Sequence, residues 1–211
     1  MIGTGNVATV LCRLFHQHGI LISHVAGRDE TKAANIASEI GAGYSTIDAI
    51  PKIPFDLAIL ALSDDFLLRD IHLLPFLDIP VVHTAGSVAM NVLKSISKHY
   101  GVLYPLQSLR KEMTHIPPIP FLIDANEEEL FHILHKLVLS ISPNVMKADD
   151  DTRRKLHLAA VWVSNFTNHM YALAKNYCQS AQIPFEMLNP LIQETATRID
   201  KHEPNKVQTG P

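Results

Sequence analysis

Apolar and polar residues alternate in two different periods up to about residue 148. Residues 6–18 have apolar side chains at positions 7, 10, 11, 14 and 15, the spacing that forms one face of a helix. Residues 56–62 (DLAILAL) form a nearly continuous apolar run, which is typical of a strand covered on both faces. We predict strands at 20–26, 56–62, 79–83, 102–104, 120–124 and 144–147, and helices at 6–18, 31–40 and 127–139. This order predicts an α/β fold with a doubly wound, mostly parallel sheet.

The pattern changes near residue 148, where the strands stop. Residues 151–177 contain neither Gly nor Pro and predict one long helix. Residues 185–199 predict a second helix that Pro190 interrupts. We therefore expect a sheet domain at residues 1–148, followed by an all-α domain at residues 149–211.

Composition narrows the class of protein. The chain has 211 residues, of which 47% are hydrophobic and 18% charged, as in a folded globular protein. A net charge of −3 gives no signature of a nucleic-acid partner, and no apolar run is long enough for a membrane helix. Cys12 and Cys178 lack paired spacing, so we expect a cytoplasmic protein. The 12 histidines show no metal-ligand spacing, and we expect no metal site.

A glycine turn opens the chain. Residues 3–8, Gly3-Thr4-Gly5-Asn6-Val7-Ala8, read G-x-G-x-x-A before a predicted helix and strand, as in a Rossmann-type dinucleotide-binding domain. Gly3 would allow the tight turn, and Gly5 would let backbone N–H groups reach a diphosphate at the helix N-terminus. The alternative is a plain turn before a helix. Only two residues precede the motif, so we expect the first strand to be largely missing and its neighbours to have exposed backbone.

The end of the second strand indicates which nucleotide binds. An acidic residue there would bind the ribose hydroxyls of NAD, but this chain has Val25-Ala26-Gly27-Arg28. The Arg28 guanidinium could hold a 2′-phosphate through two hydrogen bonds, which favours NADP. Asp29 keeps NAD as the less favoured alternative, and Arg28 could also be an ordinary solvated loop residue.

Three further loops follow predicted strands and should meet at the same edge of the sheet. They are Ser63-Asp64, His83-Thr84-Ala85-Gly86-Ser87 and Tyr104-Pro105-Leu106-Gln107-Ser108. Plain turn chemistry could explain any one of them, but three together favour a binding site.

The long predicted helix carries a polar stripe. At 100° per residue, one face presents His157, Val161, Ser164, Asn168 and Tyr171, with Asn165 at its edge. Buried polar groups need partners, so this face could line a cleft between the domains or form a satisfied helix–helix interface. The acidic and basic residues at 149–155 fit ordinary helix-end electrostatics, with an anion site as the alternative.

Several motifs together resemble one group of proteins: GTGNVA, HTAGS, YPLQS, HLAAVWVSNFTNHMYALA, LNPLIQET and QTGP. The group consists of bacterial Rossmann-like NADP oxidoreductases with a C-terminal helical domain of unknown function. Its layout is similar to that of pyrroline-5-carboxylate reductase, 6-phosphogluconate-dehydrogenase-like enzymes and the deazaflavin-using NADP oxidoreductases. The chain departs from the group at both ends, and we expect it to be a shortened form of a longer protein.

The resemblance implies a nicotinamide cofactor in the first domain, a homodimer formed by the C-terminal helices, and a small-molecule substrate between the domains. The implied cofactor contacts are Gly3, Thr4, Gly5, Asn6 and Val7 at the diphosphate, Arg28 at the 2′-phosphate, and Ser63, Asp64, His83, Gly86 and Gln107 around the nicotinamide half. The implied substrate contacts are His157, Ser164, Asn165 and Asn168.

These observations lead to a reductase hypothesis, with hydride transfer from NADPH to a small C=O or C=N compound such as a ketoacid or a cyclic imine acid. Such a reaction needs a proton donor. His157 is the first candidate and His83 the second, while Asn165 and Asn168 would orient the substrate and Ser164 would assist. One alternative is hydride exchange between NADP and a deazaflavin coenzyme. Another is a non-catalytic NADP-binding sensor or scaffold.

Overall fold

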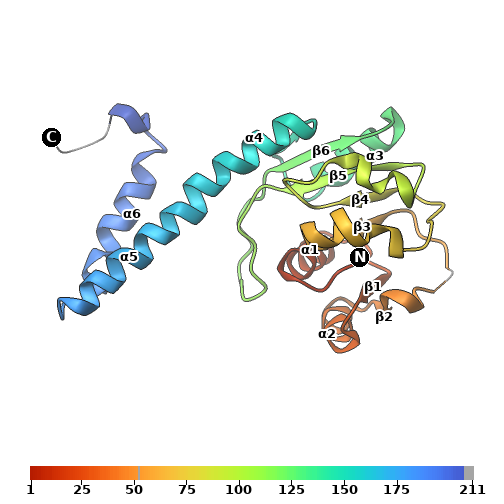
Figure 1. Cartoon of the computed structure of the whole chain (residues 1–211), viewed down its shortest axis with the longest axis horizontal. Coiled ribbons are helices and arrows are strands. Elements are labelled where there is room, and N and C mark those ends of the chain that lie inside the picture. Colours follow the sequence, from red (N-terminus) through yellow and green to blue (C-terminus); the bar gives the residue numbers. More distant parts are fainter. Residues whose placement is uncertain (52, 207–211) are drawn as a thin grey trace. The chain divides into compact units, whose positions relative to one another are not determined.

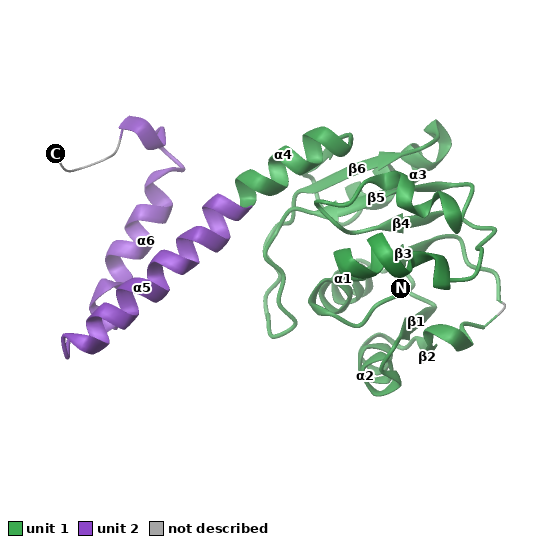
Figure 2. Cartoon of the chain, viewed as in Figure 1, with its two compact units in different colours: residues 1–160 green, residues 161–211 purple. Residues whose placement is uncertain are grey.

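The computed structural model describes residues 1–51 and 53–206. The chain divides into two compact units, Met1–Ala160 and Val161–Pro211 (Figure 2). Residues 149–160 group with the sheet unit, whereas the sequence analysis assigned them to the helical domain. Each unit is described by itself.

The first unit is built on a mostly parallel β-sheet, as predicted (Figure 1). Its strands are β1 (His24–Gly27), β2 (Gly43–Thr46), β3 (Ala58–Leu60), β4 (Val81–His83), β5 (Tyr100–Pro105), β6 (Phe121–Ala125) and β7 (Val145–Lys147). The strand order is β2-β1 in one group and β3-β4-β5-β6-β7 in the other, and the β5–β6 pair is antiparallel. Strand β2 was not predicted, because its sequence GYST is short and largely polar.

Ile2 joins the two groups of strands. It forms parallel bridges to Ala26 of β1 and to Leu60 of β3. The Ile2 N–H donates to the Ile59 carbonyl at 2.8 Å, and the Ile2 carbonyl accepts from the Ala61 N–H at 2.8 Å. The expectation of exposed backbone on the neighbouring strands is therefore wrong at Ala26, Ile59 and Ala61, because Met1 and Ile2 pair with these residues.

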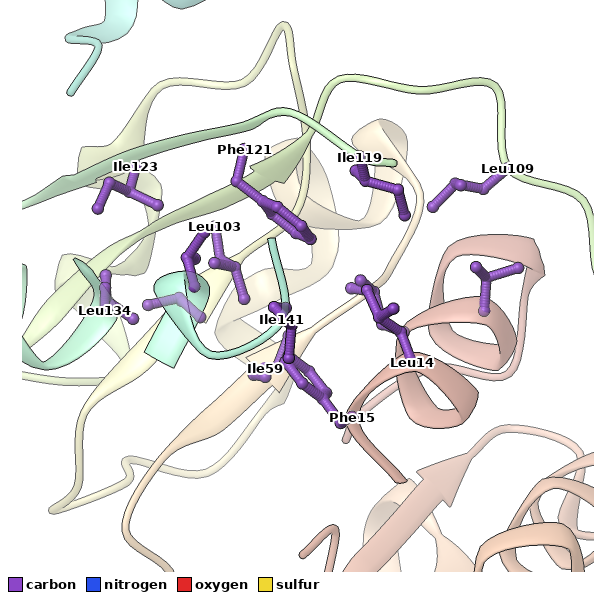
Figure 3. Packing of buried hydrophobic residues seen from close by; sticks show 14 of the residues in the cluster. Leu14, Phe15, Ile59, Leu103, Leu109, Ile119, Phe121, Ile123, Leu134 and Ile141 are labelled. Atoms are coloured by element: carbon purple, nitrogen blue, oxygen red, sulfur yellow. The ribbon is translucent and has the colours of Figure 1, made fainter. Parts of the chain in front are cut away.

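The helices of the first unit are α1 (Asn6–Gln17), α2 (Glu30–Ile40), α3 (Glu128–Leu139) and α4 (Asp150–Val161). Helices α1 and α3 pack on one face of the sheet, against side chains that include Ile59, Leu103 and Phe121 (Figure 3). The adjacent β3 residues Ala58 and Leu60 belong to a second apolar cluster with the short helical turns at 66–73 and 90–95. Because neighbouring strand residues point to opposite faces, both faces are covered, and the doubly wound prediction is confirmed.

The second unit contains a π-helical turn at Trp162–Phe166, α5 (Thr167–Ser180) and α6 (Asn189–Arg198). The prediction of a uniform helix over residues 151–177 is wrong in one respect, because the π turn changes the register between α4 and α5. Pro190 lies in the first turn of α6, where its missing N–H costs nothing, and does not interrupt a helix. The closing QTGP motif lies outside the described residues. In the part of the chain that the structure describes, no helix combines the length and the apolar character needed to cross a membrane.

Candidate functional site

The glycine turn has one strained position and one open position. Gly3 is buried at φ +126°, and a side-chain carbon there would stand 2.8 Å from the carbonyl carbon of Ala61. Gly5 precedes α1 in an extended conformation, is exposed, and has no described atom within 4 Å of the place a side chain would occupy. The backbone of the turn can therefore form only with glycine at position 3. Glycine at position 5 is not required by the fold, and it leaves space that a ligand could occupy.

Helix α1 begins directly after Gly5, and the first N–H groups of a helix have no acceptor within the helix. The Thr9 N–H donates to the Gly5 carbonyl at 3.0 Å, so the N–H groups of Asn6, Val7 and Ala8 lie ahead of the helix ladder. Among the described residues, no side chain caps this end and no acidic residue lies in its first turn. A helix end of this kind attracts anions such as a diphosphate.

The Asn6 side chain holds a neighbouring loop. Its Oδ1 accepts a hydrogen bond from the Lys111 N–H at 3.3 Å, and Arg13 donates to the Lys111 carbonyl at 2.5 Å. The Arg13 guanidinium also pairs with Glu39 at 2.6 Å. The segment that follows β5 is therefore fastened beside the glycine turn, a contact that the sequence analysis did not find.

Arg28 and Asp29, the two candidates for contact with the cofactor ribose, directly follow β1. Arg28 follows the strand and is exposed. Asp29 caps α2, since its carboxylate accepts the Lys32 N–H at 3.2 Å and pairs with Lys32 Nζ at 2.9 Å. Hydrogen bonding to Lys32 lowers the pKa of Asp29. The carboxylate is thus already engaged, which weakens the case for Asp29 as the ribose ligand of NAD.

The loops after β3 and β4 meet through Asp64 and Ser87. The Ser87 hydroxyl donates to the Asp64 carboxylate, and Ser63 Oγ accepts the Phe66 N–H at 3.4 Å. Gln107, in the loop after β5, is exposed, and its side-chain oxygen accepts the Ser108 N–H at 2.9 Å. The cofactor contacts expected of these residues stay predictions.

His83 is fully buried at the end of β4. Its Nδ1 accepts a hydrogen bond from the Ala85 N–H at 3.1 Å. Burial, with the Arg153 charge as the second cause, lowers the pKa of His83 to about 4. The ring is therefore neutral at pH 7, and this argues for His157 over His83 as a proton donor.

His157 of α4 forms a hydrogen-bonded pair with Tyr104 at the end of β5. The Tyr104 Oη lies 2.8 Å from His157 Nδ1, and the two rings meet edge to face with centroids 5.8 Å apart. A side chain on Gly86 would stand 2.6 Å from His157 Nδ1 and 2.8 Å from Tyr104 Cζ. The structure thus brings together the predicted Gly86 and His157. It adds Tyr104, whose only signal in the sequence was its place at a strand end in YPLQS.

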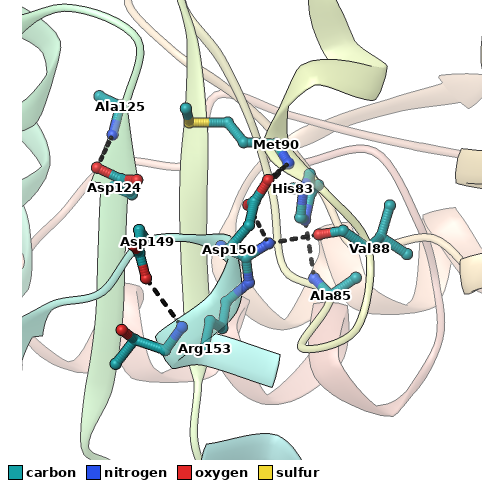
Figure 4. A network of polar contacts seen from close by, with 10 residues as sticks. His83, Ala85, Val88, Met90, Asp124, Ala125, Asp149, Asp150 and Arg153 are labelled. Carbon is teal, nitrogen blue, oxygen red and sulfur yellow. Dashed lines mark hydrogen bonds and ion pairs between the residues drawn. The ribbon is translucent and has the colours of Figure 1, made fainter. Parts of the chain in front are cut away.

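An ion pair between the buried Arg153 and the half-buried Asp150 holds α4 against the segment that follows β4 (Figure 4). Arg153 is fully buried, pairs with Asp150 at 2.8 Å and donates to the Val88 carbonyl. The Asp150 carboxylate accepts the Met90 N–H at 3.0 Å. Asp149 caps the helix by accepting the Thr152 N–H at 2.8 Å, the ordinary helix-end chemistry expected for this stretch. The sequence analysis missed the anchoring role of Arg153.

The remaining predicted substrate residues belong to the second unit. Ser164 is half-buried, and Asn165 and Asn168 are exposed. The π turn at Trp162–Phe166 alters the 100° spacing on which the single stripe through residues 157–171 was based. Their approach to a substrate stays a prediction.

A surface hollow of about 320 Å³ lies at the other edge of the sheet. It is lined by residues 125–128, 131, 132 and 147. Ala125 at its rim pairs with Gly101, near the start of β5, so the hollow lies away from Tyr104. Within residues 1–51 and 53–206, no three His, Cys, Asp or Glu side chains gather as a potential metal site.

Comparisons with known proteins show that the overall fold is shared with solved structures. The chain is 38% identical to a candidate NADP oxidoreductase from Bacteroides fragilis, with all of this chain and 83% of that chain covered and a TM-score of 0.91. The fold is also shared with 1-pyrroline-5-carboxylate reductase from Streptococcus pyogenes, at 16% identity, 99% and 84% coverage and a TM-score of 0.69. An imine reductase from Myxococcus stipitatus in complex with NADP⁺ gives 16% identity, 100% and 78% coverage and a TM-score of 0.62.

Residues 119–211 match the model of a domain of unknown function, DUF2520. Among curated proteins, none matches this sequence. The matched domain begins just before β6 and includes α4, so it spans the part of the sheet unit that carries His157 as well as the second unit.

Proposed function

This chain belongs to the family of Rossmann-like oxidoreductases that includes the Bacteroides fragilis protein, and on that premise we propose that it is an NADP-dependent reductase of a small C=O or C=N compound. The observation that carries the proposal is the uncapped N-terminus of α1 behind the Gly3–Gly5 turn. The backbone N–H groups at this helix end suit a diphosphate, and the free space at Gly5 allows the phosphate groups to approach.

NADP fits the end of β1 better than NAD. Arg28 is exposed directly after β1, and the carboxylate of Asp29 is engaged by Lys32, which supports Arg28 as the ligand of a 2′-phosphate. A guanidinium can bind a phosphate through two parallel hydrogen bonds, whereas it offers no acceptor for ribose hydroxyls.

In the proposed mechanism, residues of this chain bind the cofactor, orient the substrate and supply a proton to it. When bound, the nicotinamide supplies the hydride. The amides at the start of α1 hold the diphosphate, with Thr4 and Val7 beside it, and the loops that carry Ser63, Asp64, Gly86 and Gln107 flank the nicotinamide half. His157 supplies the proton, while Asn165 and Asn168 orient the substrate and Ser164 assists.

The second unit supports a homodimer. Cys178 is the only buried residue among residues 161–206, so this unit has almost no core of its own. Large apolar side chains are exposed along the π turn and α5: Trp162, Phe166, Met170, Leu173 and Tyr177. They recur every three or four residues and form one helix face. An apolar face of this size is typical of a protein–protein interface, and the same face on a second copy would cover it.

The test is an absorbance assay with NADPH, a panel of small ketoacids and a panel of cyclic imines. We expect NADPH oxidation with at least one substrate class, and a weaker rate with NADH. Oxidation only with an added deazaflavin would favour the hydride-exchange alternative. Tight NADPH binding without turnover of any of these would favour the sensor or scaffold, and absence of NADP(H) binding would overturn the proposal altogether.

A further inference from the structure

We propose that Tyr104 is the residue that hands the proton to the substrate and that His157 resupplies it, so that the two side chains act as one relay. The inference rests on the proposed reductase function and deepens it, since His157 alone would otherwise be the proton donor. It follows from three features of the first unit: the contact between the two rings, their place along the edge of the sheet, and the anchoring of α4.

The first feature is the geometry of the pair. The Tyr104 Oη and His157 Nδ1 are 2.8 Å apart, a normal hydrogen-bond distance. When Nδ1 carries a proton, it donates to Tyr104 Oη, and the phenolic hydrogen is then free to point elsewhere. Only glycine at position 86 leaves room for this contact, because a side-chain carbon there would meet both rings within 3 Å.

The second feature is the place of the pair along the sheet. Ile2 bridges Leu60, Leu60 pairs with His83, and His83 pairs with Val102, so these residues form one row across four neighbouring strands. The glycine turn begins directly after Ile2, and Tyr104 comes two residues after Val102. Both therefore lie at the same edge, about 14 Å apart at three strand spacings of roughly 4.8 Å.

Arg28 lies at the same edge on the opposite side of the glycine turn, since β1 pairs with Ile2 through Ala26. If the turn holds the diphosphate and Arg28 the 2′-phosphate, the ends of β4 and β5 would hold the nicotinamide half. Tyr104, at the carboxyl end of β5, would then lie beside the substrate.

The third feature is the anchor that holds His157. Arg153 lies four residues before His157 and so shares its face of α4. Its buried contacts with Asp150 and the Val88 carbonyl fix the first turns of the helix against the loop after β4. Arg153 and Asp150 are thus positioning residues: they hold the imidazole in hydrogen-bond reach of Tyr104.

The proton balance of the step is simple. The substrate carbon gains the hydride, and the π electrons of its C=N or C=O bond move to nitrogen or oxygen. That atom takes the Tyr104 Oη proton while Tyr104 Oη takes the Nδ1 proton of the His157 imidazolium. The products are the reduced compound, oxidised nicotinamide, neutral Tyr104 and neutral His157, which regains its proton from water.

The charges around the pair suit this role. Burial and the nearby Asp64 carboxylate raise the pKa of Tyr104, while the Arg153 charge opposes them. The phenol therefore keeps its proton at neutral pH until it is used. His157 is half-buried, so a path to solvent remains on its other side.

The experiment compares Tyr104→Phe, His157→Gln and the double variant, with Tyr100→Phe as the matched control at the other end of the same strand. We expect each single change to lower kcat about 100-fold with little change in KM or in NADPH affinity. The double variant should be about as slow as either single one, because both residues serve one proton. A Tyr104→Phe rate within twofold of wild type, with His157→Gln slow, would overturn the relay.

A fluorescence titration with NADPH gives a readout that does not depend on turnover. Tyr104→Phe, His157→Gln and Tyr100→Phe should all bind NADPH with a Kd within about twofold of wild type, because the relay acts on the substrate proton and not on the cofactor. A Kd raised about tenfold or more by Tyr104→Phe would show that this side chain serves binding and would overturn the relay. Binding without reduction of any substrate rejects the proposed function instead.

Discussion

Gly3 and Ala61 approach each other so closely that no side chain fits between them. A carbon on Gly3 would stand 2.8 Å from the Ala61 carbonyl carbon and nearer still to its oxygen, at a backbone φ of +126°. Gly5, two residues later, has open space where a side chain would stand and an ordinary φ of −84°. The two glycines therefore have different roles. Gly3 is required by the backbone of the fold, whereas Gly5 leaves space for the proposed ligand.

This difference predicts opposite outcomes for two single substitutions. Gly3→Ala should destabilise the protein by at least about 2 kcal/mol, because it combines a steric clash with a strained φ. Gly5→Ala should change stability by less than about 1 kcal/mol yet raise the Kd for NADPH at least about tenfold, since the methyl group would occupy the space beside the phosphate. Urea unfolding and fluorescence titration measure the two effects. Normal NADPH binding by a folded Gly5→Ala protein would place the diphosphate elsewhere.

The glycine turn could be predicted because its physical requirements are local. The tight turn, the open N-terminus of α1 and the strand β1 all lie within residues 2–27. Over so short a stretch, the spacing of the residues is enough to predict the motif. The helices and most strands were found for the same reason. The π turn at Trp162–Phe166 was missed because its residues have ordinary helix propensities.

Arg28 provides a prediction about cofactor choice. Arg28→Ala should raise the Kd for NADPH about 10- to 100-fold and leave that for NADH nearly unchanged, since a hydrogen bond to a charged group contributes roughly 1.5–3 kcal/mol. Calorimetry with both cofactors measures the ratio. Arg69→Ala is a matched control, because Arg69 is exposed on the same unit but lies in the turn after β3. An equal loss for both cofactors would mean that Arg28 contacts something other than the 2′-phosphate.

The contacts that complete the site could not be predicted from spacing. Tyr104 and His157 are 53 residues apart, and Arg153 and Val88 are 65 apart. Each pair forms only because the sheet order brings β4, β5 and α4 together. Arg153 also looks like a solvated base in the stretch DDDTRRK, whereas the fold buries it completely. Burial of a charged side chain depends on tertiary packing, which periodicity does not report.

His83 should make stability depend on pH. Its pKa is about 4 in the folded protein, below the 6.5 of an unfolded chain, so the unfolded state binds the extra proton between these values. Stability should therefore fall as pH decreases through this window, by about 2 kcal/mol between pH 7 and pH 5. Urea unfolding at both pH values measures the loss.

The control for His83 is a comparison of pH slopes. His83→Asn keeps an acceptor for the Ala85 N–H and removes the titrating ring, so its stability should change less between pH 7 and pH 5 than that of wild type. Equal slopes in wild type and His83→Asn would show that His83 binds a proton equally well in the folded and unfolded states, and would contradict the prediction.

The exposed face of α5 predicts the oligomeric state. A unit whose described residues 161–206 bury only Cys178 needs another apolar surface, and the proposed one is the same face of a second copy. Sedimentation should give twice the 23.5 kDa chain mass at micromolar concentration. Phe166→Glu should weaken the dimer at least about tenfold, because a charge would enter an apolar contact. Lys175→Glu, also on α5 and exposed, is the control and should remain dimeric. A dimer held by this face should form below about 100-micromolar chain concentration. If the wild-type chain still sediments at 23.5 kDa at that concentration, a different partner covers this face.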